Sequence, residues 1–245
     1  MKSEWLVLPR NDRQAKLRLF CFPYAGAGAA VFRTWSHTLS DQVSVCPVQL
    51  PGREYRLGEP AFRSLPALVA ALLPELLYDK PFALCGHSMG GLIAFEVARA
   101  LRRNQSKSPL HLFVSGRRAP QEPPLPPVYQ GSDADFVALI RRYGGTPEVV
   151  MREPELMEMA IRVLRADFEL LDTHAYVPEA PLDVPITAGA GELDQQTSLD
   201  SVAAWGQQTS REFKLHRFSD GHFFINTSRE LYLARLDEEL RYILK

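Results

Sequence analysis

The sequence predicts an α/β domain built on a mostly parallel, doubly wound sheet. Short apolar runs typical of strands alternate with helical patterns along most of the 245 residues. One strand-type run passes directly into a helix at Ser88, with no room for a loop between them. Strands separated by helices pair in parallel, and the helices cover both faces of the sheet. The length fits one large domain with a sizeable core.

The expected elements follow from apolar periodicity. Strand patterns occupy residues 17–22, 43–50, 82–85, 110–115, 184–188 and 212–218, and core helix patterns occupy residues 31–39, 65–77, 91–101 and 228–244. In the second helix Ser64 is a plausible N-cap, and Pro66 falls in the first turn. Pro74 lies within the same pattern and should kink or end the helix, because proline lacks the N–H that a helix interior needs.

One segment interrupts the alternation. Five prolines between residues 120 and 127 indicate a stiff, extended linker. Two helical patterns follow without a strand between them, at residues 133–143 and 155–173. The apolar stripe of the second pattern consists of Leu156, Ala160, Val163, Leu164, Phe168 and Leu171. We predict an α/β core from residues 1–119 and 177–245, and a helical lid from residues 120–176 over the carboxyl ends of the strands. The alternative is an extra helix pair packed on the core.

Composition excludes several classes of function. The formal net charge of −1 gives no electrostatic case for nucleic acid or for an anionic membrane. No stretch reaches the ~18 apolar residues needed to cross a bilayer, and no long apolar leader opens the sequence.

Cys21, Cys46 and Cys85 each lie in an apolar run, so we expect free thiols and a reducing cytosol. No spacing suggests a metal or cofactor site. A cytoplasmic monomer is expected.

The Ser88 motif predicts nucleophilic catalysis. Gly86-His87-Ser88-Met89-Gly90 matches G-x-S-x-G, with a strand before it and an apolar helix pattern after it. That context defines a nucleophile elbow, a turn so tight that the positions two before and two after the serine hold almost no side chain. Gly86 and Gly90 satisfy this requirement, and Gly91 lets the helix lie close to the sheet.

A serine hydroxyl needs a base within hydrogen-bond reach and an acid that orients the base. In this topology the chain order is Ser, then Asp or Glu, then His. His222 is the candidate base, because it follows the last expected strand directly. Asp194 is the candidate acid, in a glycine-softened loop after the strand at residues 184–188. Glu192 and Asp200 remain as reserves.

The oxyanion of such a reaction needs two backbone N–H donors. Met89 is the candidate for one, since it follows the nucleophile at the positive end of its helix. The loop from Phe22 to Gly28 is the candidate for the other, and Ala25 is the predicted donor. A phosphate-binding role for this loop is disfavoured, because no Gly-Lys-Ser or Gly-Lys-Thr follows.

Taken together, these segments resemble the stand-alone type II thioesterases of polyketide and non-ribosomal peptide synthesis, which have the α/β-hydrolase fold. The resemblance covers nearly the whole chain, and its most specific piece is Pro51-Gly52-Arg53 after the second expected strand. Further matching segments are 20–28, 32–35, 86–91, 135–136, 142–147 and 221–224. The acid loop departs from the common family pattern, since it reads Ala-Gly-Glu-Leu-Asp and offers a second carboxylate at Glu192.

The resemblance implies Ser88, Asp194 and His222 as the catalytic triad, and Ala25 and Met89 as the oxyanion site. It implies hydrolysis of acyl or aminoacyl thioesters from the phosphopantetheine arm of carrier proteins, with no cofactor of its own. Three arginine pairs, 102–103, 117–118 and 141–142, are candidates for docking an acidic carrier or the phosphate of the arm, or else form a solvated surface. Arg117-Arg118 is the best placed, because it follows the carboxyl end of an expected strand. The alternatives are a small-molecule carboxylesterase or lipase and a non-catalytic binding protein of the same fold.

Overall fold

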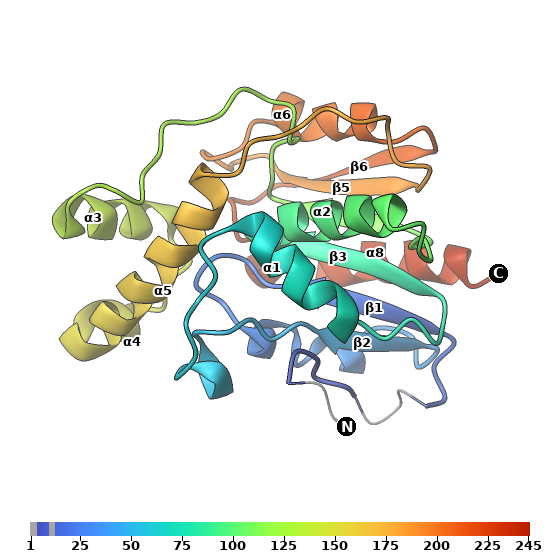
Figure 1. The fold of residues 1–245 in the computed structure, drawn as a ribbon, viewed down its shortest axis with the longest axis horizontal. Coiled ribbons are helices and arrows are strands. Elements are labelled where there is room, and N and C mark those ends of the chain that lie inside the picture. The colour runs from blue at the N-terminus through green and yellow to red at the C-terminus, as the bar shows by residue number, and fades with distance from the viewer. Residues whose placement is uncertain (1–3, 10–12) are drawn as a thin grey trace.

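The chain forms a single six-stranded sheet in which every pair of neighbouring strands is parallel (Figure 1). The structure is a computed structural model that describes residues 4–9 and 13–245. The strands are β1 (Leu17–Phe22), β2 (Val43–Pro47), β3 (Phe82–His87), β4 (Leu112–Ser115), β5 (Ile186–Gly191) and β6 (Phe213–Phe218). Their order across the sheet is β2-β1-β3-β4-β5-β6. The predicted parallel sheet is therefore confirmed.

Helices cover both faces of this sheet, as the alternation of strands and helices predicts. α1 (Leu65–Leu72), α2 (Met89–Arg103) and α6 (Leu199–Ala203) pack on one face. α7 (Phe224–Thr227) and α8 (Arg229–Ile243) pack on the other, with the short 3-10 helices η1 (Ala29–Phe32) and η2 (Trp35–His37). The side chains of β1 alternate between the two cores, with Phe20 and Phe22 in the first and Leu19 and Cys21 in the second.

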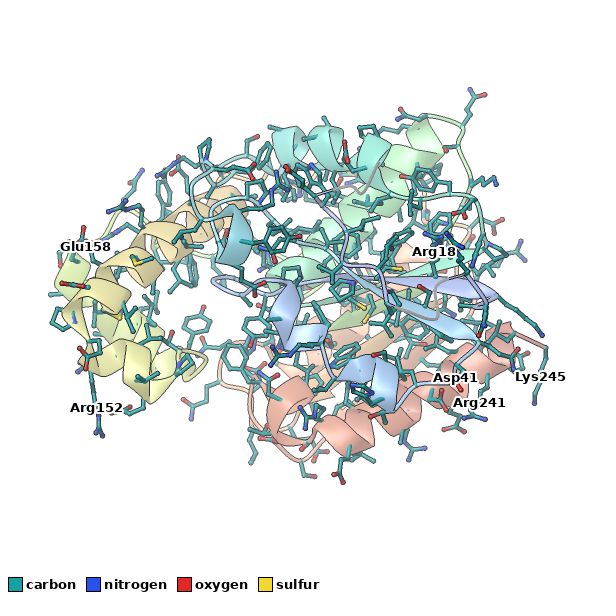
Figure 2. The ribbon with its side chains drawn as sticks, turned by 90° about the horizontal axis from the view of Figure 1, so that it is seen from below. Arg18, Asp41, Arg152, Glu158, Arg241 and Lys245 are labelled. Atoms are coloured by element: carbon teal, nitrogen blue, oxygen red, sulfur yellow. The ribbon has the colours of Figure 1, made fainter. Side chains whose placement is uncertain are left out.

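The segment between β4 and β5 carries a helical insertion that lies to one side of the sheet (Figure 1). It contains α3 (Asp133–Tyr143), α4 (Glu148–Arg152) and α5 (Pro154–Asp172), with a small core of its own around Phe136 and Phe168. Its outer surface carries the exposed ion pairs Arg152–Glu148 and Arg162–Glu158 together with exposed apolar side chains such as Val149. Figure 2 shows Arg152 and Glu158 at the end of the insertion that is remote from the sheet.

Several predicted elements differ in detail. The helix expected at residues 31–39 is two 3-10 turns, because Phe32 and Trp35 are buried edge to face at a spacing of three, with ring centroids 4.9 Å apart. The strand expected at residues 43–50 ends at Pro47, opposite the end of β1. α1 ends at Leu72 and passes into the 3-10 helix η4 (Leu73–Glu75), so Pro74 acts as predicted. Ser64 occupies the N-cap position, but its side chain makes no capping bond.

In the insertion, α3 has the predicted bounds and α5 is shifted by one residue at each end. The helix α4 was not expected. Of the predicted stripe on α5, Leu164 and Phe168 are buried, whereas Leu156 is exposed, because α5 reaches beyond the core at its first turn. In the described part of the chain, no helix is both long and apolar enough to span a membrane.

Candidate active site

Ser88 lies at the turn between β3 and α2, in a backbone conformation that few side chains adopt. Its φ is 52° and its ψ is −115°, and its N–H donates to the carbonyl of Ser115 on β4 at 2.7 Å. A Cβ added at Gly86 would lie 2.1 Å from the Gly90 carbonyl carbon, and one at Gly90 would lie 2.0 Å from the Phe22 oxygen. Only glycine fits at either position, so the predicted strand–turn–helix geometry is present.

His222 and Asp194 form a hydrogen-bonded pair at the carboxyl ends of the neighbouring strands β5 and β6. His222 Nδ1 lies 2.7 Å from Asp194 Oδ2, and the Asp194 side chain is fully buried. Since a carboxylate only accepts, Nδ1 carries the proton and Nε2 is left as the acceptor. The sequence-predicted acid and base are therefore brought together, 28 residues apart in the chain.

The loop after Asp194 holds its carboxylate in the ionised form. Oδ1 accepts the N–H of Gln196 at 2.7 Å and that of Thr197 at 3.3 Å, and Oδ2 accepts the Thr197 hydroxyl. Burial acts to raise the pKa of Asp194, but the bonds from His222, Thr197 and Gln196 outweigh it and lower the pKa. An acidic anchor that stays charged fixes the imidazole in one orientation and stabilises its protonated form.

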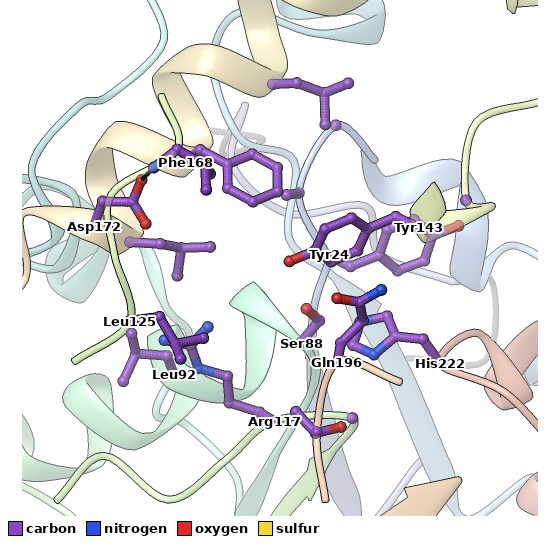
Figure 3. Close-up of a pocket in the computed structure, with 18 of the residues that line it drawn as sticks. Tyr24, Ser88, Leu92, Arg117, Leu125, Tyr143, Phe168, Asp172, Gln196 and His222 are labelled. Atoms are coloured by element: carbon purple, nitrogen blue, oxygen red, sulfur yellow. Dashed lines mark hydrogen bonds between the residues drawn. The ribbon is translucent and has the colours of Figure 1, made fainter. Parts of the chain in front are cut away.

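Ser88 and His222 line the same cavity, whose volume is about 760 Å³. Figure 3 shows Ser88, Gln196 and His222 together on one side of it, with Phe168 and Asp172 from α5 across the space. Much of the wall is apolar, contributed by Leu92, Leu125, Ile140, Leu164, Phe168 and Leu171. The cavity therefore has a polar end at the sheet edge, with Ser88 and His222, and an apolar chamber under the helical insertion.

The two predicted oxyanion donors border this site. Met89 is the first residue of α2, where helical N–H groups have no partner within the helix. Ala25 lines the cavity in the loop after β1. Its neighbour Gly26 has a φ of +78° and donates its N–H to Asp167 Oδ2 at 2.7 Å. The loop is thus held by a side chain from the insertion.

The reserve acids have other partners or positions. Glu192 accepts a 2.7 Å bond from the Ser219 hydroxyl at the surface, and Asp200 is an exposed residue of the first turn of α6. Asp220 accepts bonds from Gly221, Thr227 and Ser228, which is the turn role expected beside a glycine. Among the described residues, only Asp194 has a carboxylate that is hydrogen-bonded to His222.

His87, inside the elbow, serves a structural purpose. Its Nδ1 lies 2.9 Å from the Ser115 hydroxyl, and its ring lies among aromatic rings that include Tyr24 and Phe224. Burial lowers the pKa of His87 well below its ordinary value, with the nearby His222 adding to the effect. His87 therefore stays neutral and packs beneath the site.

The arginine pairs separate into different environments. Arg102 and Arg103 bind Glu179, and Arg141 and Arg142 are exposed on α3. Arg118 pairs with Glu122 at 3.5 Å. Arg117 instead lines the cavity beside Leu92 (Figure 3) and forms no ion pair with any described residue. Burial lowers its pKa to about 10, so it still carries a positive charge at neutral pH.

Sequence reasoning missed two contributions to the site. Thr197 binds the acid through Asp-x-x-Thr spacing, a local signal that an Asx-turn search would find. Arg53 was noted only as part of a motif, and its partner Asp167 is 114 residues away, beyond any local pattern. Among the described residues, no cluster of His, Cys, Asp or Glu could hold a metal ion.

Comparison with known proteins places this architecture in a family. The thioesterase domain model matches residues 17–238. The gramicidin S biosynthesis protein GrsT of Aneurinibacillus migulanus is 40% identical over 245 residues, covering 99% of this chain and 96% of that protein. The RedJ thioesterase of the prodiginine pathway in Streptomyces coelicolor has a TM-score of 0.86 at 39% identity, covering 93% of this chain and 91% of its own. The type II thioesterase BorB from the borrelidin cluster has a TM-score of 0.87 at 32% identity, with 96% and 97% covered. The chain therefore belongs to the thioesterase family, among the type II thioesterases of non-ribosomal peptide and polyketide pathways.

Proposed function

We propose that this thioesterase releases acyl and aminoacyl groups from the phosphopantetheine arm of carrier proteins through an acyl-serine at Ser88. The observation that carries the proposal is the 2.7 Å bond between His222 and a buried Asp194, in the cavity that Ser88 lines from its strained turn. The oriented imidazole leaves Nε2 as the base that a serine hydroxyl needs.

The reaction follows from these groups. His222 Nε2 takes the proton of Ser88 as its oxygen attacks the thioester carbonyl, and the new oxyanion is held by the N–H groups of Met89 and Ala25. The C–S bond breaks, the thiol leaves with the proton from His222, and an ester of Ser88 remains. A thiol with a pKa of about 8.5 departs more readily than an amine. Water activated by His222 then hydrolyses the ester and restores Ser88.

The helical insertion is proposed to act as a lid over the acyl chamber, with residues 1–119 and 177–245 as the catalytic core. Its α3 and α5 residues form the apolar wall opposite Ser88, and Tyr143 of α3 meets the ring of His222 edge to face, with centroids 6.0 Å apart. A wall of this kind sequesters the acyl group from water until hydrolysis.

The carrier protein is proposed as the partner, and the chain as a cytoplasmic monomer. The three cysteines are buried free thiols, which suits a reducing compartment. Arg102 and Arg103 are bound to Glu179 and Arg118 to Glu122, so these three are partly neutralised. Arg117, which lines the cavity, is the candidate for binding the phosphate of the arm, and the exposed Arg141 and Arg142 are candidates for docking the carrier protein.

One experiment separates carrier hydrolysis from its alternatives. Turnover of acyl groups on a purified carrier protein is compared with turnover of the same acyl groups as ethyl esters, and fluorophosphonate labelling of Ser88 is measured in parallel. We expect labelling and a higher kcat/KM on the carrier. Faster turnover of the free esters would favour a carboxylesterase, and an unlabelled Ser88 would favour a non-catalytic binding protein.

A further inference from the structure

A buried ion pair joins the helical insertion to the core directly beside the oxyanion loop. Arg53, after β2, donates from Nη1 to Asp167 Oδ2 and from Nη2 to Asp167 Oδ1, both at 2.7 Å. Asp167 lies on α5, and the two side chains are only 6% and 3% exposed. The geometry is bidentate, which fixes direction as well as distance.

The same two side chains also hold the loop after β1. Asp167 Oδ2 accepts the N–H of Gly26 at 2.7 Å, and Arg53 Nη1 donates to the carbonyl of Ala27 at 3.3 Å. α5 lies so close that a Cβ on Gly26 would be 2.7 Å from the Leu164 side chain. The backbone on the carboxyl side of Ala25 is therefore positioned by one residue of the core and one of the insertion.

The core end of this connection is rigid. The Gln49 amide donates to the Arg53 carbonyl at 2.9 Å and accepts the N–H of Ala29 at 2.9 Å. Arg53 thus belongs to a buried network that holds the loop at Gly26, Ala27 and Ala29. A buried ion pair is weak evidence for stability, since an apolar pair of similar volume often serves as well. What an apolar pair cannot supply is an acceptor for the Gly26 N–H.

We propose that Asp167 and Arg53 are positioning residues that aim the Ala25 N–H at the oxyanion, so that catalysis depends on α5 being docked. This inference rests on the proposed function, in which Ala25 is an oxyanion donor. The insertion then does more than enclose the acyl group, because its docking completes the site that stabilises the transition state. Because Leu164 and Phe168 of α5 line the cavity, an acyl group bound there is expected to influence the docking of α5 and, through it, the position of the Ala25 N–H.

The test uses the Arg53→Leu/Asp167→Leu double variant, which removes the acceptor without leaving an unpaired charge. The matched control is Glu239→Gln, which breaks the ion pair between the buried Glu239 carboxylate of α8 and the partly exposed Lys214 of β6, remote from the cavity. For each protein we would measure melting temperature, kcat, KM and the pH profile of kcat/KM. We would also measure the affinity of an acyl trifluoromethyl ketone, which forms a tetrahedral oxyanion on Ser88, and of a non-hydrolysable amide of the same acyl group.

The double variant should melt near the wild-type temperature and keep its KM and pH profile. Its kcat should fall, at most by the factor of about 10²–10³ that loss of one oxyanion donor produces. Affinity for the trifluoromethyl ketone should fall by a similar factor, with little change for the amide. Glu239→Gln should lower the melting temperature and leave both affinities at wild-type values.

Asp167→Asn supplies a second variant, since asparagine keeps an oxygen for Gly26 but loses the charge. It should be less thermostable than the double variant, because Arg53 stays buried without a counter-ion, yet retain more of kcat below its melting temperature. Unchanged kcat in the double variant, or equal losses of affinity for ketone and amide, would overturn the proposal. Turnover by Ser88→Ala would instead overturn the proposed function, so the two failures are distinguishable.

Discussion

The two walls of the cavity are built in different ways. The sheet wall consists of turns at the ends of β1, β3, β5 and β6. Backbone hydrogen bonds join the turns after β3, β5 and β6 to their neighbours, as when the Ser88 N–H donates to Ser115 and the Leu193 N–H donates to Asp220. The insertion wall, α3 to α5, rests on the core largely through side chains such as Asp167 and Tyr143. Ser88, Asp194 and His222 are therefore held by the sheet, whereas the apolar chamber and the loop of the proposed donor Ala25 depend on side-chain contacts with the insertion.

The largest loss of activity is expected from a substitution in the sheet wall. Ser88→Ala should lower kcat by on the order of 10⁶-fold, as for the nucleophile of a serine protease. Loss of one small hydroxyl leaves the elbow intact, so the melting temperature should stay near the wild-type value. Quenched-flow release of acid from an acyl carrier protein measures the change. Retention of more than about a hundredth of the activity would remove Ser88 from the role of nucleophile.

Asp194→Asn should follow, with a loss of kcat of about 10⁴-fold. An amide at this position can donate to His222 Nδ1 and favour the wrong tautomer, with little change in shape. Glu192→Gln and Asp200→Asn are the matched controls, because neither carboxylate contacts His222. A larger loss in either control than in Asp194→Asn would reassign the acid.

His111, directly before β4, should make a measurable contribution to the pH dependence of stability. His111 lies 2.8 Å from the Thr187 hydroxyl and stacks on Phe113, and burial lowers its pKa to about 4. The unfolded imidazole, with a pKa of about 6.5, binds more protons between these pH values. The contribution of His111 to stability is therefore fully present above pH ~6.5, and up to about 3 kcal/mol is lost as the pH drops to about 4.

Urea titrations of the wild type and of His111→Gln across this range measure that contribution. The difference in unfolding free energy between the two proteins should shrink as the pH falls. His37→Gln, at an exposed position, is the control for replacing a histidine with glutamine. A pH-independent difference at His111 would contradict the account.

The smallest loss of activity is expected from a substitution in the insertion wall. Ile140→Ala on α3 widens the acyl chamber, so kcat/KM for a long acyl chain should fall roughly tenfold while that for an acetyl group stays the same. Steady-state kinetics over a series of acyl lengths on one carrier protein provides the measurement. Equal losses for every length would show that the insertion acts on the chemistry and not on the fit of the acyl chain.

The sequence predicts the sheet wall well because its signals are local. A strand, a glycine-bounded serine and a loop after a strand each occupy a few adjacent residues, and parallel pairing brings the carboxyl ends to one edge. For that reason Asp194 and His222 could be paired before their distance was known.

The insertion wall is less predictable for physical reasons. The contact between Arg53 and Asp167 joins positions 114 residues apart, and the sequence around either residue contains no motif that predicts the other as its partner. The stripe on α5 predicts which face is apolar but not where the core ends, so Leu156 is exposed. The η1 and η2 turns likewise follow from the packing of Phe32 on Trp35, a tertiary contact that overrides helical periodicity.

The most direct test of the central claim is to trap the covalent intermediate. The protein is mixed with an acyl carrier protein, quenched with acid within milliseconds, digested, and the peptide that contains Ser88 is weighed by mass spectrometry. Our account predicts that this peptide gains the mass of the acyl group, and that the gain decays as free acid forms. Release of acid with no acyl group on Ser88 at any time, or with the acyl group on another residue, would contradict it.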